Sequence, residues 1–209
     1  MLNLIRKDLI VLRWYFLFVA AYVLVFGVIT VTPFSPMMLV VLPTMMLTLF
    51  ATNLEIRNKS MLFVGSLPVG RKQIVQAKYA SFFVYLAIGI VLGCLSNLSN
   101  QVRYGPEDFP FSLQTLALAV FVSMLFTSLY YPLYYWLGTK SAAIATFSTL
   151  FLTAAGIAGF ISVADSVDIG IANVSGFPFL YALPLVGLAL LFVSYRLSLA
   201  IFLRKDMGS

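Results

Sequence analysis

Long apolar stretches without charged side chains make up well over half of this chain. No Asp, Glu, Lys or Arg lies deep inside any of them, although such residues form 10% of the sequence. The 62% apolar content and the mean hydropathy of +1.02 are far above the roughly 45–50% apolar content of soluble domains. The pattern predicts a single all-α membrane domain over residues 1–209. It argues against coupling to an ion gradient, because proton and sodium relays need ionisable groups at membrane depth.

Six segments are long and apolar enough to be transmembrane helices, since one crossing needs roughly 20 apolar residues with a rise of about 1.5 Å each. They are Trp14–Thr32, Pro36–Leu54, Tyr79–Leu98, Leu113–Leu137, Ser141–Val163 and Phe179–Tyr195. The connections at 33–36 and 138–140 are short, so they predict two tight helical hairpins.

The charges between these segments fall almost wholly on one side. With six crossings both termini share a side, and all 13 lysines and arginines except Arg103 lie on it. The other side carries Glu107, Asp108, Asp165 and Asp168. Because lysine and arginine are enriched on the cytoplasmic side of membrane proteins, we predict that both termini are cytoplasmic. This topology accounts for the net charge of +6, so we do not expect nucleic-acid binding.

Composition argues against catalysis. The chain contains no histidine and one cysteine, Cys94, inside an apolar segment. Ser-His-Asp and Cys-His catalysis, histidine-ligated metal sites and an intrachain disulfide are therefore excluded. The acids outside the spans do not lie at membrane depth, where an intramembrane aspartyl protease would need them. No GxxxxGK[ST] phosphate-binding motif occurs, so the chain does not hydrolyse ATP by that route.

Three segments outside the spans have a character of their own. Residues 1–13 place Leu2, Ile5, Leu9 and Leu12 on one face, which predicts an interfacial amphipathic helix with Asp8 on the polar face; the alternative is a simple positive flank. Residues 55–78 predict a cytoplasmic contact segment with a short helix, a proline break and a second helix, or else a solvated basic loop. Residues 99–112 predict an outer loop, and residues 164–178 predict short helices in the outer leaflet.

Polar side chains also recur inside the spans. Hydroxyls lie four residues apart at Thr44, Thr48 and Thr52, at Ser123 and Thr127, and at Thr149 and Thr153, and glycines at Gly89 and Gly93. Small residues at this spacing mark close helix packing, and hydroxyls can bond the carbonyl one turn back. The alternative is a polar path for a substrate. The candidates for that path are Thr48, Thr52, Ser123, Thr127, Tyr131 and Tyr134.

The cytoplasmic segment contains a recognisable motif. SLPVGRKQIVQAKY, from Ser66 to Tyr79, resembles the SLPVSRKEIVxxKY signature of small ABC-2 type permeases, the membrane subunits of bacterial ABC exporters. The upstream residues Glu55–Lys59 and the opening Asn3–Leu9 are similar to the same family. The motif departs from the family pattern at Gly70, where serine is usual, and at Gln73, where glutamate is usual. The aromatic residue that is common soon after the Asn-Lys pair is also missing.

The resemblance implies a type V exporter-like fold with six transmembrane helices, an N-terminal interfacial helix, and a coupling helix at about Arg57–Leu67 that docks on an ATPase. It implies two permease subunits, identical or related, with two separate ATPase subunits that bind ATP and Mg. No cofactor is expected in this chain. The implied residues for coupling to the ATPase are Glu55, Arg57, Asn58, Lys59, Leu67, Pro68, Arg71 and Lys72.

The sequence and the resemblance together predict a permease in the bacterial cytoplasmic membrane that exports amphipathic or hydrophobic substrates. Exporters of cytolytic peptides of the phenol-soluble-modulin type are the nearest similarity, and permeases for lantibiotic or bacitracin resistance look much alike. The rival hypotheses are an energy-independent channel and a regulatory membrane subunit whose basic segment binds another protein.

Overall fold

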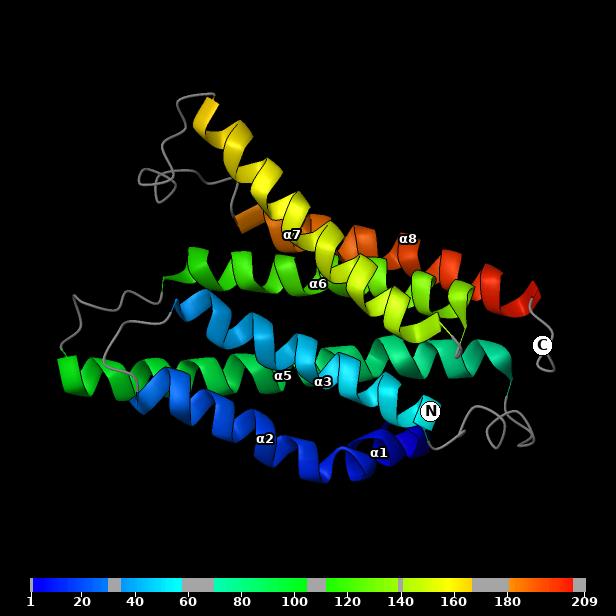
Figure 1. The fold of residues 1–209 in the computed structure, drawn as a ribbon, viewed down its shortest axis with the longest axis horizontal. Coiled ribbons are helices and arrows are strands. Elements are labelled where there is room, and N and C mark those ends of the chain that lie inside the picture. The colour runs from blue at the N-terminus through cyan, green and yellow to red at the C-terminus, as the bar shows by residue number, and fades with distance from the viewer. Residues whose placement is uncertain are drawn as a thin grey trace.

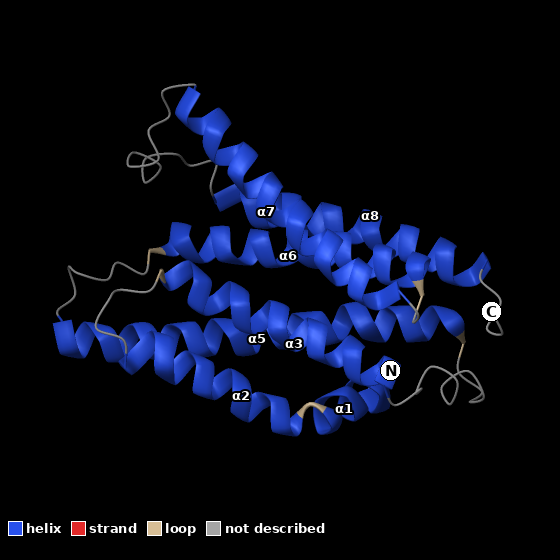
Figure 2. Ribbon diagram, in the orientation of Figure 1, coloured by secondary structure: helices blue, strands red, loops and turns tan. Residues whose placement is uncertain are grey.

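The described part of the chain is helical throughout. The computed structural model describes residues 2–29, 35–57, 70–104, 112–138, 141–166 and 181–204, and within these ranges it contains no strand (Figure 2). The elements are α1 (Leu2–Val11), α2 (Arg13–Leu24), the π-helical η1 (Val25–Ile29), α3 (Pro36–Arg57), α5 (Arg71–Tyr104), α6 (Leu113–Leu137), α7 (Ala142–Ser166) and α8 (Leu183–Arg204). The prediction of an all-helical chain is confirmed.

Four of these helices are long and apolar enough to cross a membrane: α3, α5, α6 and α8. Two shorter apolar helices, Arg13–Gly27 and Ala143–Gly156, fall within the first and fifth predicted spans. Each predicted span therefore coincides with a helix in the described residues. The count of six crossings stays a prediction, because within the described residues four helices meet the criteria of length and apolarity for a membrane span.

The helices lie in an elongated bundle with α6 at its centre. Helix α6 packs along α8 on one side and against α3 on another, and α5 lies beside α3 (Figure 1). The start of α1, the end of α3, the start of α5 and the end of α8 lie together at one end of the bundle (Figure 1). We call this the basic end, because it carries Arg6, Lys7, Arg57, Arg71, Lys72, Lys78 and Arg204. The bundle thus brings to one end seven of the 12 basic residues that the charge pattern assigned to one side.

Several predicted boundaries were wrong because helical structure continues beyond the apolar core of a segment. Helix α5 runs on through residues 99–104, which were predicted as loop, and it ends directly before the Gly105-Pro106 pair that disfavours helix. Helix α8 continues past Tyr195 to Arg204, because apolar residues recur around Arg196. Helix α7 includes Ala164–Ser166, and the rest of the outer segment 164–178 lies outside the described residues.

The two glycines of the third span lie where α5 crosses α3. A Cβ atom on Gly89 would meet the hydroxyl of Thr44 and would lie 2.9 Å from the carbonyl oxygen of Val40. On Gly93 it would lie 2.5 Å from Cγ2 of Val40. Only glycine lets the two backbones approach this closely, as at small-residue contacts between membrane helices. The prediction that these glycines mark close packing is confirmed.

Replacing Gly89 with alanine tests this contact. The added methyl group cannot avoid the backbone carbonyl of Val40, so we expect Gly89→Ala to destabilise the fold by about 1–3 kcal/mol, as overpacking usually does. Thermal unfolding of the detergent-solubilised protein measures the change. The matched control is Gly156→Ala in α7, where a Cβ meets nothing within 4 Å. Equal melting temperatures for the two variants would contradict the close approach.

Candidate functional site

Four charged side chains form a closed ring at the basic end. Nζ of Lys78 lies 2.7 Å from Oε2 of Glu55 and 3.5 Å from Oδ2 of Asp8. Nζ of Lys7 lies 3.5 Å from Oδ1 of Asp8 and 3.8 Å from Oε1 of Glu55. Charges of opposite sign therefore alternate around the ring. We call these four residues the ionic ring; it joins α1, α3 and α5.

The ionic ring lies almost wholly inside the protein. The side chains of Lys78 and Glu55 are each 5% exposed and that of Asp8 is 10% exposed, whereas that of Lys7 is 35% exposed. Two bases and two acids cancel, so the buried ring carries no net charge. Buried charges are tolerated when they are paired in this way, and the loss of one partner leaves an uncompensated charge.

The position of one ring residue differs from what the sequence predicted. Asp8 was placed on the solvated face of the first helix, but it points to Lys78 and accepts a 3.5 Å hydrogen bond from the Ser81 hydroxyl. The carboxylate of Glu55 points into the bundle in this conformation, and its predicted contact with the ATPase stays a prediction. The physical reason is that Lys78, near the start of α5, has no access to water and draws both acids inward.

One sequence signal could have found the ring. In the sequence, Asp8, Glu55 and Lys78 each have an apolar residue on at least one side. An acid at the end of one helix and a base at the start of the next can meet when the helices pack side by side. The distance of 70 residues between Asp8 and Lys78 is what hid their pairing, because only the tertiary fold brings α1 to α5.

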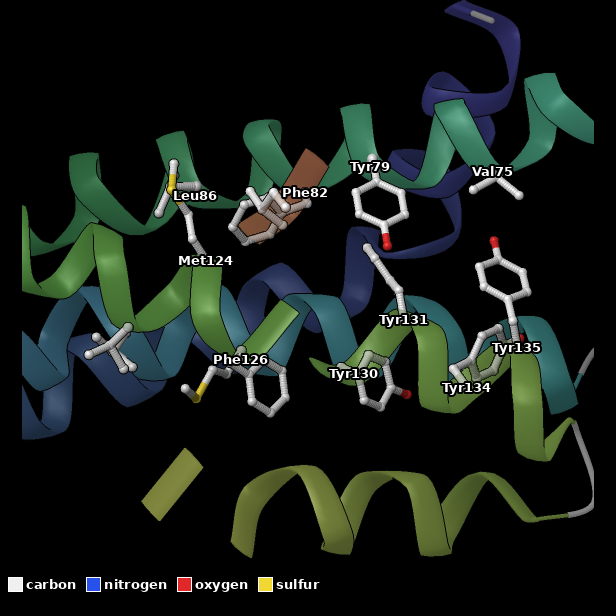
Figure 3. Close-up of a cluster of buried hydrophobic side chains, with 14 of the residues drawn as sticks. Val75, Tyr79, Phe82, Leu86, Met124, Phe126, Tyr130, Tyr131, Tyr134 and Tyr135 are labelled. Carbon is white, nitrogen blue, oxygen red and sulfur yellow. The ribbon is translucent and has the colours of Figure 1, made fainter. Parts of the chain in front are cut away.

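A layer of tyrosines lies next to the ring, on the side of α6. Figure 3 shows Tyr79 of α5 directed toward Tyr131 of α6, and their ring centroids are 4.9 Å apart. The Tyr131 hydroxyl donates to the carbonyl oxygen of Lys78 at 3.3 Å. Tyr134 and Tyr135 follow one turn later and are almost fully buried. In this conformation these tyrosines fill the bundle interior.

Tyr79 connects three helices through hydroxyl groups. Its oxygen lies 2.7 Å from Oγ of Ser194 and 2.9 Å from Oγ of Ser198, both on α8. Ser194 donates its own proton to the carbonyl oxygen of Ser128 on α6. Its oxygen therefore accepts from Tyr79, and Ser198 donates to Tyr79 in turn. These hydrogen bonds connect α5, α6 and α8 next to the ionic ring, since Tyr79 directly follows Lys78.

The six predicted substrate-path residues are all buried in this conformation, at 2% exposure or less. Thr48, Ser123 and Thr127 each donate to the carbonyl oxygen one turn back. Thr52 is 2.6 Å from the Tyr130 hydroxyl, so the α3 and α6 stripes meet at that point. Here the hydroxyls satisfy the bundle's own backbone, and their role in a substrate path stays a prediction.

The predicted coupling residues are described only in part. Arg57 is exposed at the end of α3, and Lys72 is exposed in the first turn of α5. Arg71 donates to the carbonyl oxygen of Leu203 at 3.3 Å, which fixes the start of α5 to the end of α8. Asn58, Lys59, Leu67 and Pro68 lie outside the described residues. The contact with an ATPase therefore stays a prediction for all of them.

No group of three or more His, Cys, Asp or Glu side chains gathers within the described ranges in a way that could hold a metal ion. The two buried carboxylates, Asp8 and Glu55, instead face lysine ammonium groups. This arrangement fixes three helices to one another by charge.

Comparison with known proteins gives one match. A protein-family model described as "ABC-2 family transporter protein" matches residues 3–203, which is almost the whole chain. No curated protein and no solved structure matches the chain. The matched range includes α1, the ionic ring and every helix through most of α8.

Removing one hydroxyl tests the connection through Tyr79. Tyr79→Phe keeps the aromatic ring but deletes the hydrogen bonds to Ser194 and Ser198. We therefore expect a destabilisation of about 1 kcal/mol, the scale of interhelical hydrogen bonds in membranes. Thermal unfolding in detergent measures it. The matched control is Tyr195→Phe, whose ring packs edge-on against Tyr79 at 5.6 Å. A smaller loss for Tyr79→Phe than for Tyr195→Phe would contradict the assignment.

Proposed function

Because the chain belongs to the ABC-2 transporter protein family, we propose that it is the transmembrane permease subunit of an ATP-driven exporter. The observation that carries this proposal is the family match over residues 3–203. It agrees with a bundle whose helices α3, α5, α6 and α8 are long and apolar enough to cross a membrane. Members of this family are membrane components of transporters and are generally not catalytic. We therefore do not expect the chain to be an enzyme.

We propose that the energy comes from a separate ABC ATPase, which binds ATP and Mg. The supporting observation is the basic end, where Arg57 closes α3 and Arg71 and Lys72 open α5. The cytoplasmic segment 55–78 joins these helices, so a protein that docks on it can act on both. Of the implied contact residues, Asn58, Lys59, Leu67 and Pro68 are best placed in sequence to touch the ATPase, because Glu55 points inward.

Two permease subunits, identical or related, are proposed to form the translocation path. The interior of one copy is filled at its centre, where Phe126, Tyr130 and Thr127 are fully buried. A path therefore requires either a second copy or a movement of α3 against α6. The stripe that includes Thr48, Thr52, Ser123 and Thr127 would become accessible in such a movement.

We propose amphipathic or hydrophobic substrates, with cytolytic or antimicrobial peptides as the first class to test. Apart from the ionic ring, which is paired within itself, the buried core of the described helices is made of apolar, hydroxyl and amide side chains. These groups suit a ligand with an apolar body and few charges. The proposed location is the bacterial cytoplasmic membrane with both termini in the cytoplasm, as the one-sided distribution of lysine and arginine supports.

Purification of the tagged chain from its own cells in a mild detergent tests the proposal. We expect an ABC ATPase to remain bound in stoichiometric amount, as identified by mass spectrometry. We also expect it to be lost when residues 58–69 are replaced by a flexible linker of equal length. A wild-type chain that purifies without an ATPase would favour a channel or a regulatory subunit instead.

Single substitutions in the same segment test the coupling contact. Lys59→Glu reverses a charge and Leu67→Trp adds bulk. We expect each variant to export less substrate while the chain still reaches the membrane. Export of a labelled amphipathic peptide from cells measures the effect. The control is Arg196→Glu, an equal charge reversal at an exposed position of α8. Unchanged export in both segment variants would remove these residues from the coupling surface.

A further inference from the structure

The ionic ring occupies a particular place relative to the cytoplasmic segment. Glu55 lies in the last turn of α3 and Lys78 in the second turn of α5, so the 2.7 Å ion pair closes the base of the segment between them. Asp8 and Lys7 add the N-terminal helix α1 to the same contact. Any force on the segment therefore reaches three helices at once.

The ring resists being opened. Lys78 and Glu55 are shielded from water, and separating them would leave each as a buried charge without its nearest partner. On the side of α6, Tyr134 is 2% exposed and Tyr131 is 1% exposed, so water does not replace a lost partner from that direction. Asp8 is also held by the Ser81 hydroxyl and by the ammonium group of Lys7. A ring of this kind is better suited to keep helices together than to break and re-form.

Helix α1 also packs on the bundle through apolar side chains. Beyond the ring, its described apolar contacts are those of Leu9 and the adjoining Leu12, which pack in the cluster between α2, α3 and α5. That cluster also contains Val19 and Tyr85. Apolar contacts of this kind allow sliding, whereas ion pairs with defined partners fix both distance and register.

We propose that the ionic ring is a clamp that makes α1, the end of α3 and the start of α5 move as one rigid body during transport. Lys7, Asp8, Glu55 and Lys78 are thus positioning residues that pass movement of the cytoplasmic segment to the N-terminal helix. The inference rests on the proposed function, because it takes the ATPase as the source of that movement. It assigns to Glu55 a role inside the permease in place of contact with the ATPase.

Distance measurement between α1 and α5 tests the clamp. Nitroxide labels replace the exposed residues Arg6 and Gln73 in a Cys94→Ser background, and pulsed electron paramagnetic resonance is recorded on the purified chain with any ATPase that it carries. We expect a narrow distance distribution that is the same without nucleotide and after trapping with ATP and vanadate. We expect the distribution to broaden in Asp8→Asn. The control Arg196→Gln removes an exposed charge on α8 and leaves the distribution narrow.

Transport of a labelled amphipathic peptide by the reconstituted complex gives the second readout. Asp8→Asn and Glu55→Gln are expected to retain ATP hydrolysis and to lose transport per ATP hydrolysed. Lys78→Arg keeps the charge and is expected to retain transport. Inverting only Glu55 and Lys78 would place like charges beside Lys7 and Asp8, so we expect no rescue. Inverting all four residues restores the alternation and is expected to recover transport.

The outcomes separate the clamp from the proposed function. A wild-type complex that transports while the distance from α1 to α5 changes with nucleotide would overturn the clamp and leave the exporter intact. A narrow distribution in Asp8→Asn with unchanged transport would also overturn it. A chain without an ATPase would refute the proposed function, while broadening in Asp8→Asn would still support the clamp. If the fourfold inversion fails to fold, the clamp is tested by transport per ATP hydrolysed in Lys78→Arg and Asp8→Asn. Retention in the first with loss in the second supports the clamp, and equal values overturn it.

Discussion

The burial of polar and charged side chains in the bundle interior is the constraint on which the rest of the structure depends. A charge or hydroxyl that cannot reach water must find a partner within the protein. Lys78 finds two carboxylates, and these in turn bring α1 and the end of α3 against α5. Several hydroxyl groups find a partner too, either by bonding their own helix, as Thr48 does, or by joining helices, as Tyr79 does.

Packing and polar pairing support one another along α5. Toward one end, Gly89 and Gly93 bring its backbone close to α3, and this close approach leaves no room for side chains. Toward the basic end the two helices are linked by the ion pair between Glu55 and Lys78. Helix α5 is therefore fixed to α3 at two places by different forces. Close van der Waals packing acts at Gly89 and Gly93, and charge acts between Glu55 and Lys78. The proposed clamp uses the second of these.

The permease function and the clamp place different demands on the same helices. The proposed transport would require α3 and α6 to separate or a second copy to complete the path, because their hydroxyl stripes are buried together around Thr52 and Tyr130. The clamp requires α1, α3 and α5 to stay together at the basic end. Both hold if the bundle moves about contacts on α6, where hydrogen bonds such as that from Tyr131 to Lys78 are neutral and can exchange.

The sequence alone determined the helical class and the approximate positions of the helices, because hydropathy acts locally and needs no knowledge of neighbours. The close packing at Gly89 was also predictable from its spacing with Gly93. Only the tertiary structure decided which polar groups meet. Asp8 was predicted to lie on the polar face of its helix, yet it turns inward to Lys78, where it meets Glu55 in one ionic ring. Their pairing depends on helices that are distant in sequence, and the cost of burying an unpaired lysine is set by the completed bundle.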